Sequence, residues 1–149
     1  MNDAHDGRIV ERNRESLFGS KPPLSYPVFE NGKFNEQNIR GHICRLKLEH
    51  PEWLIGEHDS LTRICAIAFD YAHQPVRDFR LALIEEAIAE YDIDGIELDF
   101  LRHPLVFKPG AERIHAHLMT EFIGRVRNAL DRAGKERSKN LCLAVRTLV

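Results

Sequence analysis

Two carboxylates that could do acid-base or nucleophilic chemistry, Glu97 and Asp99, lie two residues apart in an otherwise apolar segment. Residues 93–100 have the length and composition of a β-strand, and strand side chains alternate between the two faces of a sheet. Both acids therefore share one face. Burying a carboxylate costs free energy unless it is paired, bound to a metal or needed for chemistry. We expect a buried strand that carries a catalytic site.

The elements that would position these acids alternate regularly over residues 61–149. The expected strands cover residues 64–69, 93–100 and 141–145, and the expected helices cover residues 75–91 and 111–133. Pro75 suits the first turn of the first helix, and Gly134 is expected to end the second. The apolar row of the second helix comprises Ile114, Leu118, Phe122, Val126 and Leu130. This β-α-β-α-β order predicts a parallel sheet with outer helices.

Composition and length restrict the class of protein. With 149 residues, 43% hydrophobic and 30% charged, the chain predicts one globular domain. A net charge of −2 does not indicate a nucleic-acid or membrane surface. No apolar run approaches the roughly 18 residues of a membrane span. Residues 1–60, which are rich in proline and contain Asn31-Gly32, predict a loop-rich insertion with one short helix over residues 35–49.

Two architectures fit the element order. A doubly wound open sheet usually carries a glycine-rich phosphate loop after its first strand, and this chain has none. A (β/α)8 TIM barrel needs about 250 residues, and three strands supply less than half of it. We interpret the chain as the β-α-β-α-β portion of a TIM barrel, and expect it to be a fragment of a longer protein.

Strand parity brings several ionisable side chains together in such a barrel. With the apolar faces turned toward the helices, Asp70, Asp99 and Arg146 end their strands on the inner face, and Glu97 lies one layer deeper. Barrel active sites lie at these carboxyl ends. Two other readings stay open. Arg146 could form a structural ion pair with either strand acid, and Asp70 could cap the loop and helix that follow it.

The remaining candidates are predicted to bind substrate. They are Arg102, His103, Asn2, Asp3, His5 and Trp53, together with Arg146. His103 could equally be an ordinary loop residue, and Trp53 could pack in a core instead of stacking on a sugar ring. The polar cluster at the start of the chain could end a preceding strand or form a frayed tail. Cys65 and Cys142 lie in apolar strands and are expected to be small buried hydrophobes.

The segments Phe69–Asp78 (FDYAHQPVRD) and Tyr91–Asp99 (YDIDGIELD) resemble the glycosyl-hydrolase-like barrel proteins. Those proteins show a D-x-x-x-P-E-V-R opening and a Y-D-V-D-G-I-x-x-D strand. The start of the chain and the segment His50–Leu54 resemble an uncharacterised bacterial branch of that group. The resemblance implies a (β/α)8 barrel truncated at both ends and a role in carbohydrate hydrolysis. We expect no cofactor.

The chain departs from related patterns at several positions. It has Gln74-Pro75-Val76-Arg77 where the family has Pro-Glu-Val-Arg. Leu101 occupies the position of the catalytic acid in family-18 chitinases, so their mechanism is not supported. Gly95, Asp99 and His103 match the spacing of the amylase superfamily, although Glu97 stands where that pattern has arginine.

We therefore expect a glycoside-hydrolase-like enzyme in which Asp99 is the leading catalytic carboxylate and Glu97 or Asp70 assists it. The second essential acid is expected to be Glu97 or Asp70, or to lie on a strand absent from this chain. Arg102 and Arg146 would hold a neighbouring carboxylate ionised. His103, Trp53 and the cluster at the start of the chain would bind sugar hydroxyls. Two alternatives stay open. One is a barrel that binds carbohydrate or a protein without chemistry. The other is a metal-dependent hydrolase or isomerase, with Asp3, His5, Asp70 and Asp99 as its candidate ligands.

Overall fold

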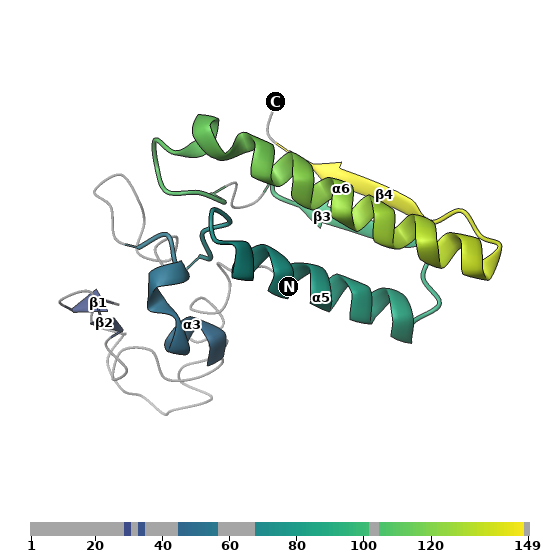
Figure 1. Ribbon diagram of the computed structural model, residues 1–149, viewed down its shortest axis with the longest axis horizontal. Helices are drawn as coiled ribbons and strands as arrows, with labels where there is room; N and C mark the ends of the chain where they lie inside the picture. Colours follow the sequence, from purple (N-terminus) through teal and green to yellow (C-terminus); the bar gives the residue numbers. More distant parts are fainter. Residues whose placement is uncertain (1–28, 31–32, 35–44, 57–67, 102–104, 148–149) are drawn as a thin grey trace, which may run out of the picture. The chain divides into compact units, whose positions relative to one another are not determined.

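The computed structural model divides into two compact units, Met1–Asp70 (unit 1) and Tyr71–Val149 (unit 2). It describes residues 29–30, 33–34, 45–56, 68–101 and 105–147. Unit 2 contains the two long helices and the parallel strands (Figure 1). Within these described ranges, no helix is both long and apolar enough to cross a membrane.

Unit 1 contains short elements. These are β1 (Phe29–Glu30), β2 (Lys33–Phe34), α3 (Arg45–Glu49) and the 3-10 helix η2 (Pro51–Trp53), with β1 antiparallel to β2. Leu54 forms an isolated antiparallel bridge with Phe69, and the buried Ile55 and Ala68 lie beside them. The helix expected over residues 35–49 is confirmed only at its end, where α3 lies. Residues 35–44 lie outside the described residues. The strand expected over residues 64–69 is described only from Ala68 onward.

Unit 2 has the expected α/β order. Its elements are α5 (Gln74–Glu90), β3 (Gly95–Asp99), α6 (Glu112–Arg137) and β4 (Cys142–Arg146). Strands β3 and β4 are hydrogen-bonded parallel neighbours, paired from Gly95 with Cys142 to Asp99 with Arg146. Parallel strands need a crossover connection, and α6 supplies it. The α/β class is therefore confirmed for a two-stranded parallel sheet with two helices.

The core of unit 2 lies between the helices and one face of this sheet. Leu98 of β3 packs in one cluster with Leu141 and with buried residues of both helices, among them Phe122, Val126 and Leu130. The first member of the predicted apolar row does not reach it, since Ile114 is 71% exposed. A helix of 26 residues is about 39 Å long, whereas five strand residues span about 17 Å. The amino-terminal part of α6 therefore extends past the strands.

A buried arginine holds the turn before α5. The N-cap residue His73 makes no side-chain capping bond, and Pro75 lies in the first turn as expected. Arg77, only 4% exposed, donates from Nη1 to the carbonyls of Tyr71, at 2.5 Å, and Ala72, at 3.0 Å. Because helix side chains lean toward the amino terminus, Arg77 can reach back over this turn. It stabilises the start of α5 where a capping side chain usually does.

The prediction that Gly134 ends α6 is wrong. The helix continues to Arg137, and Ser138 takes the left-handed conformation with φ 51°. The Lys139 amide donates to the Gly134 carbonyl at 2.9 Å, and the Ser138 amide donates to Lys135 at 3.3 Å. These bonds form a Schellman motif. Gly134 is required for another reason, since a Cβ there would lie 2.5 Å from the Lys139 carbonyl oxygen.

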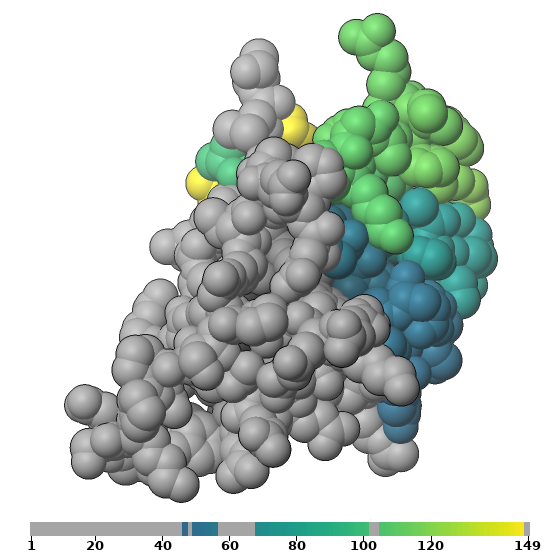
Figure 2. Space-filling view, turned by 90° about the vertical axis from the view of Figure 1, so that its left-hand side faces the viewer, coloured from purple at the N-terminus to yellow at the C-terminus, as the bar shows by residue number. Residues whose placement is uncertain are grey.

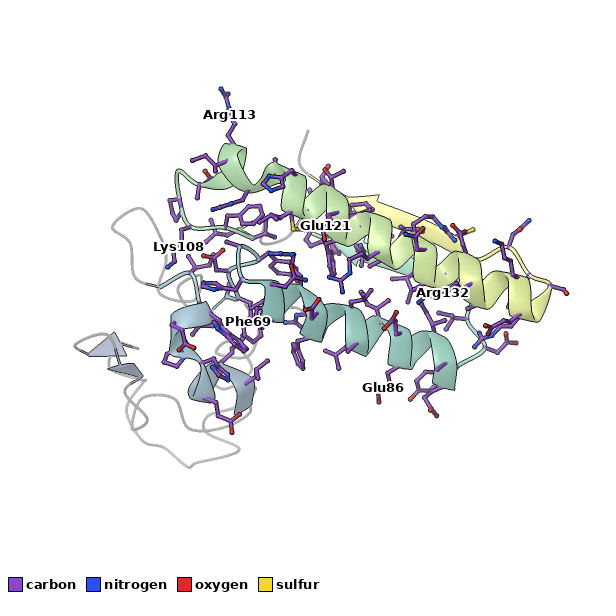
Figure 3. The ribbon with its side chains drawn as sticks, in the orientation of Figure 1. Phe69, Glu86, Lys108, Arg113, Glu121 and Arg132 are labelled. Carbon is purple, nitrogen blue, oxygen red and sulfur yellow. The ribbon has the colours of Figure 1, made fainter. Side chains whose placement is uncertain are left out.

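Ion pairs join the two helices. Arg125 Nη2 lies 2.7 Å from Asp78 Oδ1, and Arg132 Nη2 lies 3.0 Å from Glu85 Oε1. The residues of α6, in green, and of α5, in teal, lie against each other in Figure 2. Arg132 extends from α6 toward α5 (Figure 3). The two helices are therefore held together by these partly exposed ion pairs as well as by the apolar core.

The last arginine of α6 also binds the end of α5. Arg137 Nη1 donates to the Tyr91 carbonyl at 3.1 Å, and its Nη2 donates to the Ile88 carbonyl. The last carbonyls of a helix lack partners within the helix itself. Arg137 supplies them with donors and places a positive charge at the negative end of α5.

Replacing Asp78 with asparagine should lower the free energy of unfolding by less than about 1 kcal/mol at pH 7, because the pair with Arg125 is half exposed. The hydrogen bond from Arg125 is the main cause that holds the Asp78 pKa below its ordinary value. The pair's contribution is therefore complete above that ordinary pKa, about 3.9, and is lost as pH falls through the lower folded-state pKa.

Urea unfolding at pH 7 and at about pH 2 checks this expectation, and the difference between wild type and variant should shrink in acid. Glu86→Gln is the matched control, since Glu86 is exposed and points away from α6 in Figure 3. An Asp78→Asn effect that is equally large at both pH values would contradict the ion pair.

Candidate functional site

The carboxylates of β3 lie on the face of the sheet opposite the helices. Leu98 is buried and Ile96 packs against the core, so their side of β3 faces α5 and α6. Glu97 and Asp99 share the other side, as strand parity predicts. The expectation of a buried strand is wrong for this side, because the side chains are 53% and 42% exposed. Core packing within unit 2 covers only the apolar side of β3.

Strand β4 contributes a matching set of side chains. Leu143 packs against the core, whereas Cys142, Ala144 and Arg146 are exposed. The prediction that Cys142 is a small buried hydrophobe is therefore wrong. Its apolar neighbours in sequence face the helices, and the alternation of the strand turns the thiol away from them. Together with Gly95, Cys142 and Ala144 form a patch of small side chains beside the acids.

A single guanidinium contacts both carboxylates. Arg146 Nη1 lies 3.4 Å from Glu97 Oε1 and 3.4 Å from Asp99 Oδ2. The parallel register places Asp99 directly beside Arg146, and the Phe100 amide donates to the Arg146 carbonyl at 3.0 Å. The other carboxylate oxygen of Asp99 accepts a hydrogen bond from the Leu101 amide at 3.0 Å. Asp99 is thus oriented by one contact to each of its oxygens.

This arrangement, the carboxylate–arginine cluster of Glu97, Asp99 and Arg146, lies toward the carboxyl ends of two adjacent parallel strands. Its two acids and one base leave an excess of negative charge on an exposed surface. Such a group can accept hydrogen bonds from hydroxyls, act as a base, or form a covalent bond through a carboxylate. The same contacts also fit a structural ion pair, the alternative considered from sequence.

No protein-family model matches this chain. No curated protein matches it either. The resemblance to glycosyl-hydrolase-like barrels therefore stays a prediction, and the chemistry must be argued from the described residues.

Asp70 belongs to unit 1, whereas the carboxylate–arginine cluster belongs to unit 2. Asp70 is 3% exposed, and its amide donates to the Trp53 carbonyl at 2.8 Å. His73, not Asp70, occupies the N-cap position of α5. The proposed role of Asp70 as an assisting carboxylate stays a prediction.

Trp53 lies in a small aromatic stack in unit 1. Its ring is parallel to that of His50, with centroids 3.7 Å apart and an interplanar angle of 6°. His50 Nδ1 lies 2.9 Å from Glu52 Oε1, which fixes the imidazole in place. One face of the indole is therefore covered by His50. A sugar ring could stack only on the other face.

The remaining predicted site residues lie outside the described residues. They are Arg102, His103, Asn2, Asp3 and His5. Among the residues that the structure describes, no group of three or more His, Cys, Asp or Glu side chains could hold a metal ion. The metal-dependent alternative names two described residues, Asp70 and Asp99, and two that lie outside that set.

Two buried basic side chains escape the sequence analysis. Lys47 is fully buried in unit 1, with Nζ 5.2 Å from the centre of the Phe69 ring, and Arg77 is buried in unit 2. Arg77 lies four residues before the buried Leu81, a spacing that places both on one helix face. This four-residue spacing is the signal in the sequence that could have indicated a buried Arg77. Both residues support local structure, because Arg77 binds backbone carbonyls and Lys47 lies against an aromatic ring.

Tyr71, which lies within the resemblance segment Phe69–Asp78, is packed against aromatic rings. Its ring packs edge-on against two others, with ring centroids 5.7 Å apart for Phe122 and 6.5 Å apart for Phe100. Burial raises the pKa of the Tyr71 hydroxyl. Tyr71 therefore packs against the core of unit 2, and its hydroxyl stays protonated at neutral pH.

Proposed function

We propose that this chain is part of a glycoside-hydrolase-like (β/α)8 barrel that acts on a carbohydrate through the carboxylates of β3. The observation that supports the proposal is the carboxylate–arginine cluster, where Arg146 Nη1 lies 3.4 Å from both Glu97 and Asp99. In a barrel, the face opposite the helices is the interior, and the carboxyl ends of the strands carry the active site. The position of the cluster, on the face opposite the helices and toward the carboxyl ends of β3 and β4, therefore supports the proposal.

In this proposal Asp99 is the leading carboxylate. Its oxygens are held by Arg146 and by the Leu101 amide, so the group is oriented before a substrate arrives. Glycoside hydrolysis normally uses two carboxyl groups, about 5–5.5 Å apart for retention and about 6.5–9.5 Å apart for inversion. Glu97, in the same cluster, is the candidate for the second, and the role of Asp70, which belongs to unit 1, stays a prediction. Arg146 acts as a positioning residue, because it contacts the two strand acids.

The test is sugar release by the full-length barrel that the proposal implies, from a panel of nitrophenyl glycosides and unlabelled oligosaccharides, each with and without a chelator. We expect release that chelation does not change, since carboxylate catalysis of this kind needs no metal. Loss of activity with chelator would favour the metal-dependent hydrolase. Absence of release from every substrate would contradict the proposal.

The shared contact of Arg146 also favours a second candidate, a protein that binds carbohydrate or a protein partner without chemistry. In that case the acids serve as a charged binding surface and the arginine as their structural partner. Saturable binding of an oligosaccharide without product release would identify it. A double variant, Glu97→Gln with Arg146→Met, should then remain folded and lose binding.

A further inference from the structure

The chain turns directly after the leading carboxylate. Asp99 is the last residue of β3, and its Oδ1 accepts a hydrogen bond from the Leu101 amide at 3.0 Å. A side-chain bond to the amide two residues on forms an Asx-turn. Between them, the Phe100 amide donates to the Arg146 carbonyl at 3.0 Å. We call residues 99–101 the Asp99 turn.

The side chain of Phe100 connects this turn to the core of unit 2. Strand alternation directs it to the face opposite Asp99, where it packs against the core cluster. There its ring meets the Tyr71 ring edge-on, with centroids 6.5 Å apart and an interplanar angle of 87°. Tyr71 packs in the same way against Phe122 of α6, which is 2% exposed. The Tyr71 ring therefore lies between the Asp99 turn and a fully packed part of the core.

The backbone of Tyr71 is fixed at both of its polar groups. Its amide donates to the Val106 carbonyl at 2.8 Å, and its carbonyl accepts a bond from the buried Arg77 at 2.5 Å. Tyr71 thus contacts the chain both before and after residues 102–104, which lie outside the described residues. A ring attached to so constrained a backbone gives Phe100 a fixed surface to pack against.

The plainest explanation of Tyr71 is core packing, because a buried aromatic ring stabilises a domain wherever it lies. Core packing accounts for the contact with Phe122. It does not require the same residue to hold Phe100, which follows a strand, and Val106, which lies in a connecting segment. Backbone in such connections is usually more variable than in the elements that they join. The two roles also predict different results for the Asp99 carboxylate.

We propose that Tyr71 is a positioning residue for Asp99, because its ring holds Phe100 and thereby the turn that orients the carboxylate. Asp99 is 42% exposed, so core packing does not fix its side chain. Its orientation depends on the Leu101 amide and on Arg146, and both contacts depend on where the backbone of the turn lies. The effect on turnover rests on the proposed function, whereas the effect on the orientation of the carboxylate does not.

The first experiment is NMR on the 149-residue chain. Lowering the pH from about 7 to about 3 adds a proton to most aspartates and should move the Leu101 amide signal, because that amide donates to Asp99. Asp99→Asn identifies the part of the response that is due to this carboxylate. We expect Tyr71→Leu to lose most of that part, and Tyr71→Phe, which keeps the ring, to retain it.

Ile88→Ala is the control for a merely structural role. Ile88 is buried in the same core but lies near the other end of α5. Its loss should lower the midpoint of urea unfolding and leave the Leu101 response unchanged. A full response in Tyr71→Leu, or an equal loss in Ile88→Ala, would overturn the positioning role. Phe100→Leu removes the same ring contact from the other side, and serves if Tyr71→Leu does not fold.

The second experiment measures turnover by the full-length barrel. Tyr71→Leu should lower kcat about tenfold or more, since small displacements of a reacting group are costly. The same substitution should have little effect when Asp99 is already asparagine, because the two act through one carboxylate. An equal loss in both backgrounds would contradict the positioning role. Absence of sugar release by the wild-type barrel would contradict the proposed function alone, and the Leu101 response would still decide the role of Tyr71.

Discussion

Replacing Gly95 with valine is expected to separate β3 from β4 and to lower the free energy of unfolding by about 3 kcal/mol or more. Gly95 pairs with Cys142 across the sheet. A Cβ at this position would lie 2.3 Å from the Cys142 carbonyl oxygen and 2.8 Å from its nitrogen. The obstructing atoms are backbone, so no side chain can rotate away. The strand pair must open or move apart, and the core beneath it would lose its sheet.

Gly124→Ala is the matched control for this substitution. Gly124 lies within α6, and a Cβ there would meet nothing within 4 Å. Alanine in the interior of a helix is favoured over glycine by about 0.5–1 kcal/mol, so the control should gain stability. Urea unfolding of both variants gives the comparison. Wild-type stability in the valine variant would show that β3 and β4 do not approach as closely as described.

Asp99→Asn should reduce glycoside turnover by a factor of about 10²–10⁴, the range expected when a catalytic acid or base is lost. This expectation rests on the proposed function. Asparagine has the same shape and keeps an acceptor for the Leu101 amide, which donates to Asp99 Oδ1 at 3.0 Å. Asp99 is also 42% exposed, so little stability should be lost with the charge. Folding measured by circular dichroism should therefore stay the same.

Asp92→Asn provides the control for turnover. Asp92 is another exposed acid of unit 2, and it pairs with Lys139 on the surface, outside the carboxylate–arginine cluster. We expect it to retain turnover. Full activity in Asp99→Asn would remove Asp99 from the mechanism, whereas a loss in both variants would indicate a general effect of surface charge.

The helices of unit 2 could be predicted because their signals are local. The spacing of Phe122, Val126 and Leu130 alone identifies the buried side of α6. Two details depend on distant parts of the chain. Ile114 continues the same row but lies beyond the strands, and Gly134 is required by the chain that returns after the helix. Neither the length of the sheet under α6 nor the path of the turn can be derived from spacing.

In the candidate site too, some features depend on neighbouring residues and could be predicted, whereas others depend on distant parts of the chain and could not. Alternation along β3 correctly predicts that Glu97 and Asp99 share a face, since that depends only on neighbouring residues. The exposure of this face could not be predicted, because it depends on what packs over the sheet. The contact of Arg146 with both acids depends on the register that pairs it with Asp99, which is a property of two strands together.

The bonds from Arg137 to the carbonyls of Ile88 and Tyr91 join residues 49 and 46 positions apart. The last turn of α5 therefore gains its final donors only after the chain has passed through β3 and the whole of α6. Until α6 docks, that turn is free to fray. Once α6 is docked, these bonds couple the carboxyl-terminal ends of the two helices, so we expect amide hydrogens at the end of α5 and at the end of α6 to exchange as one cooperative unit.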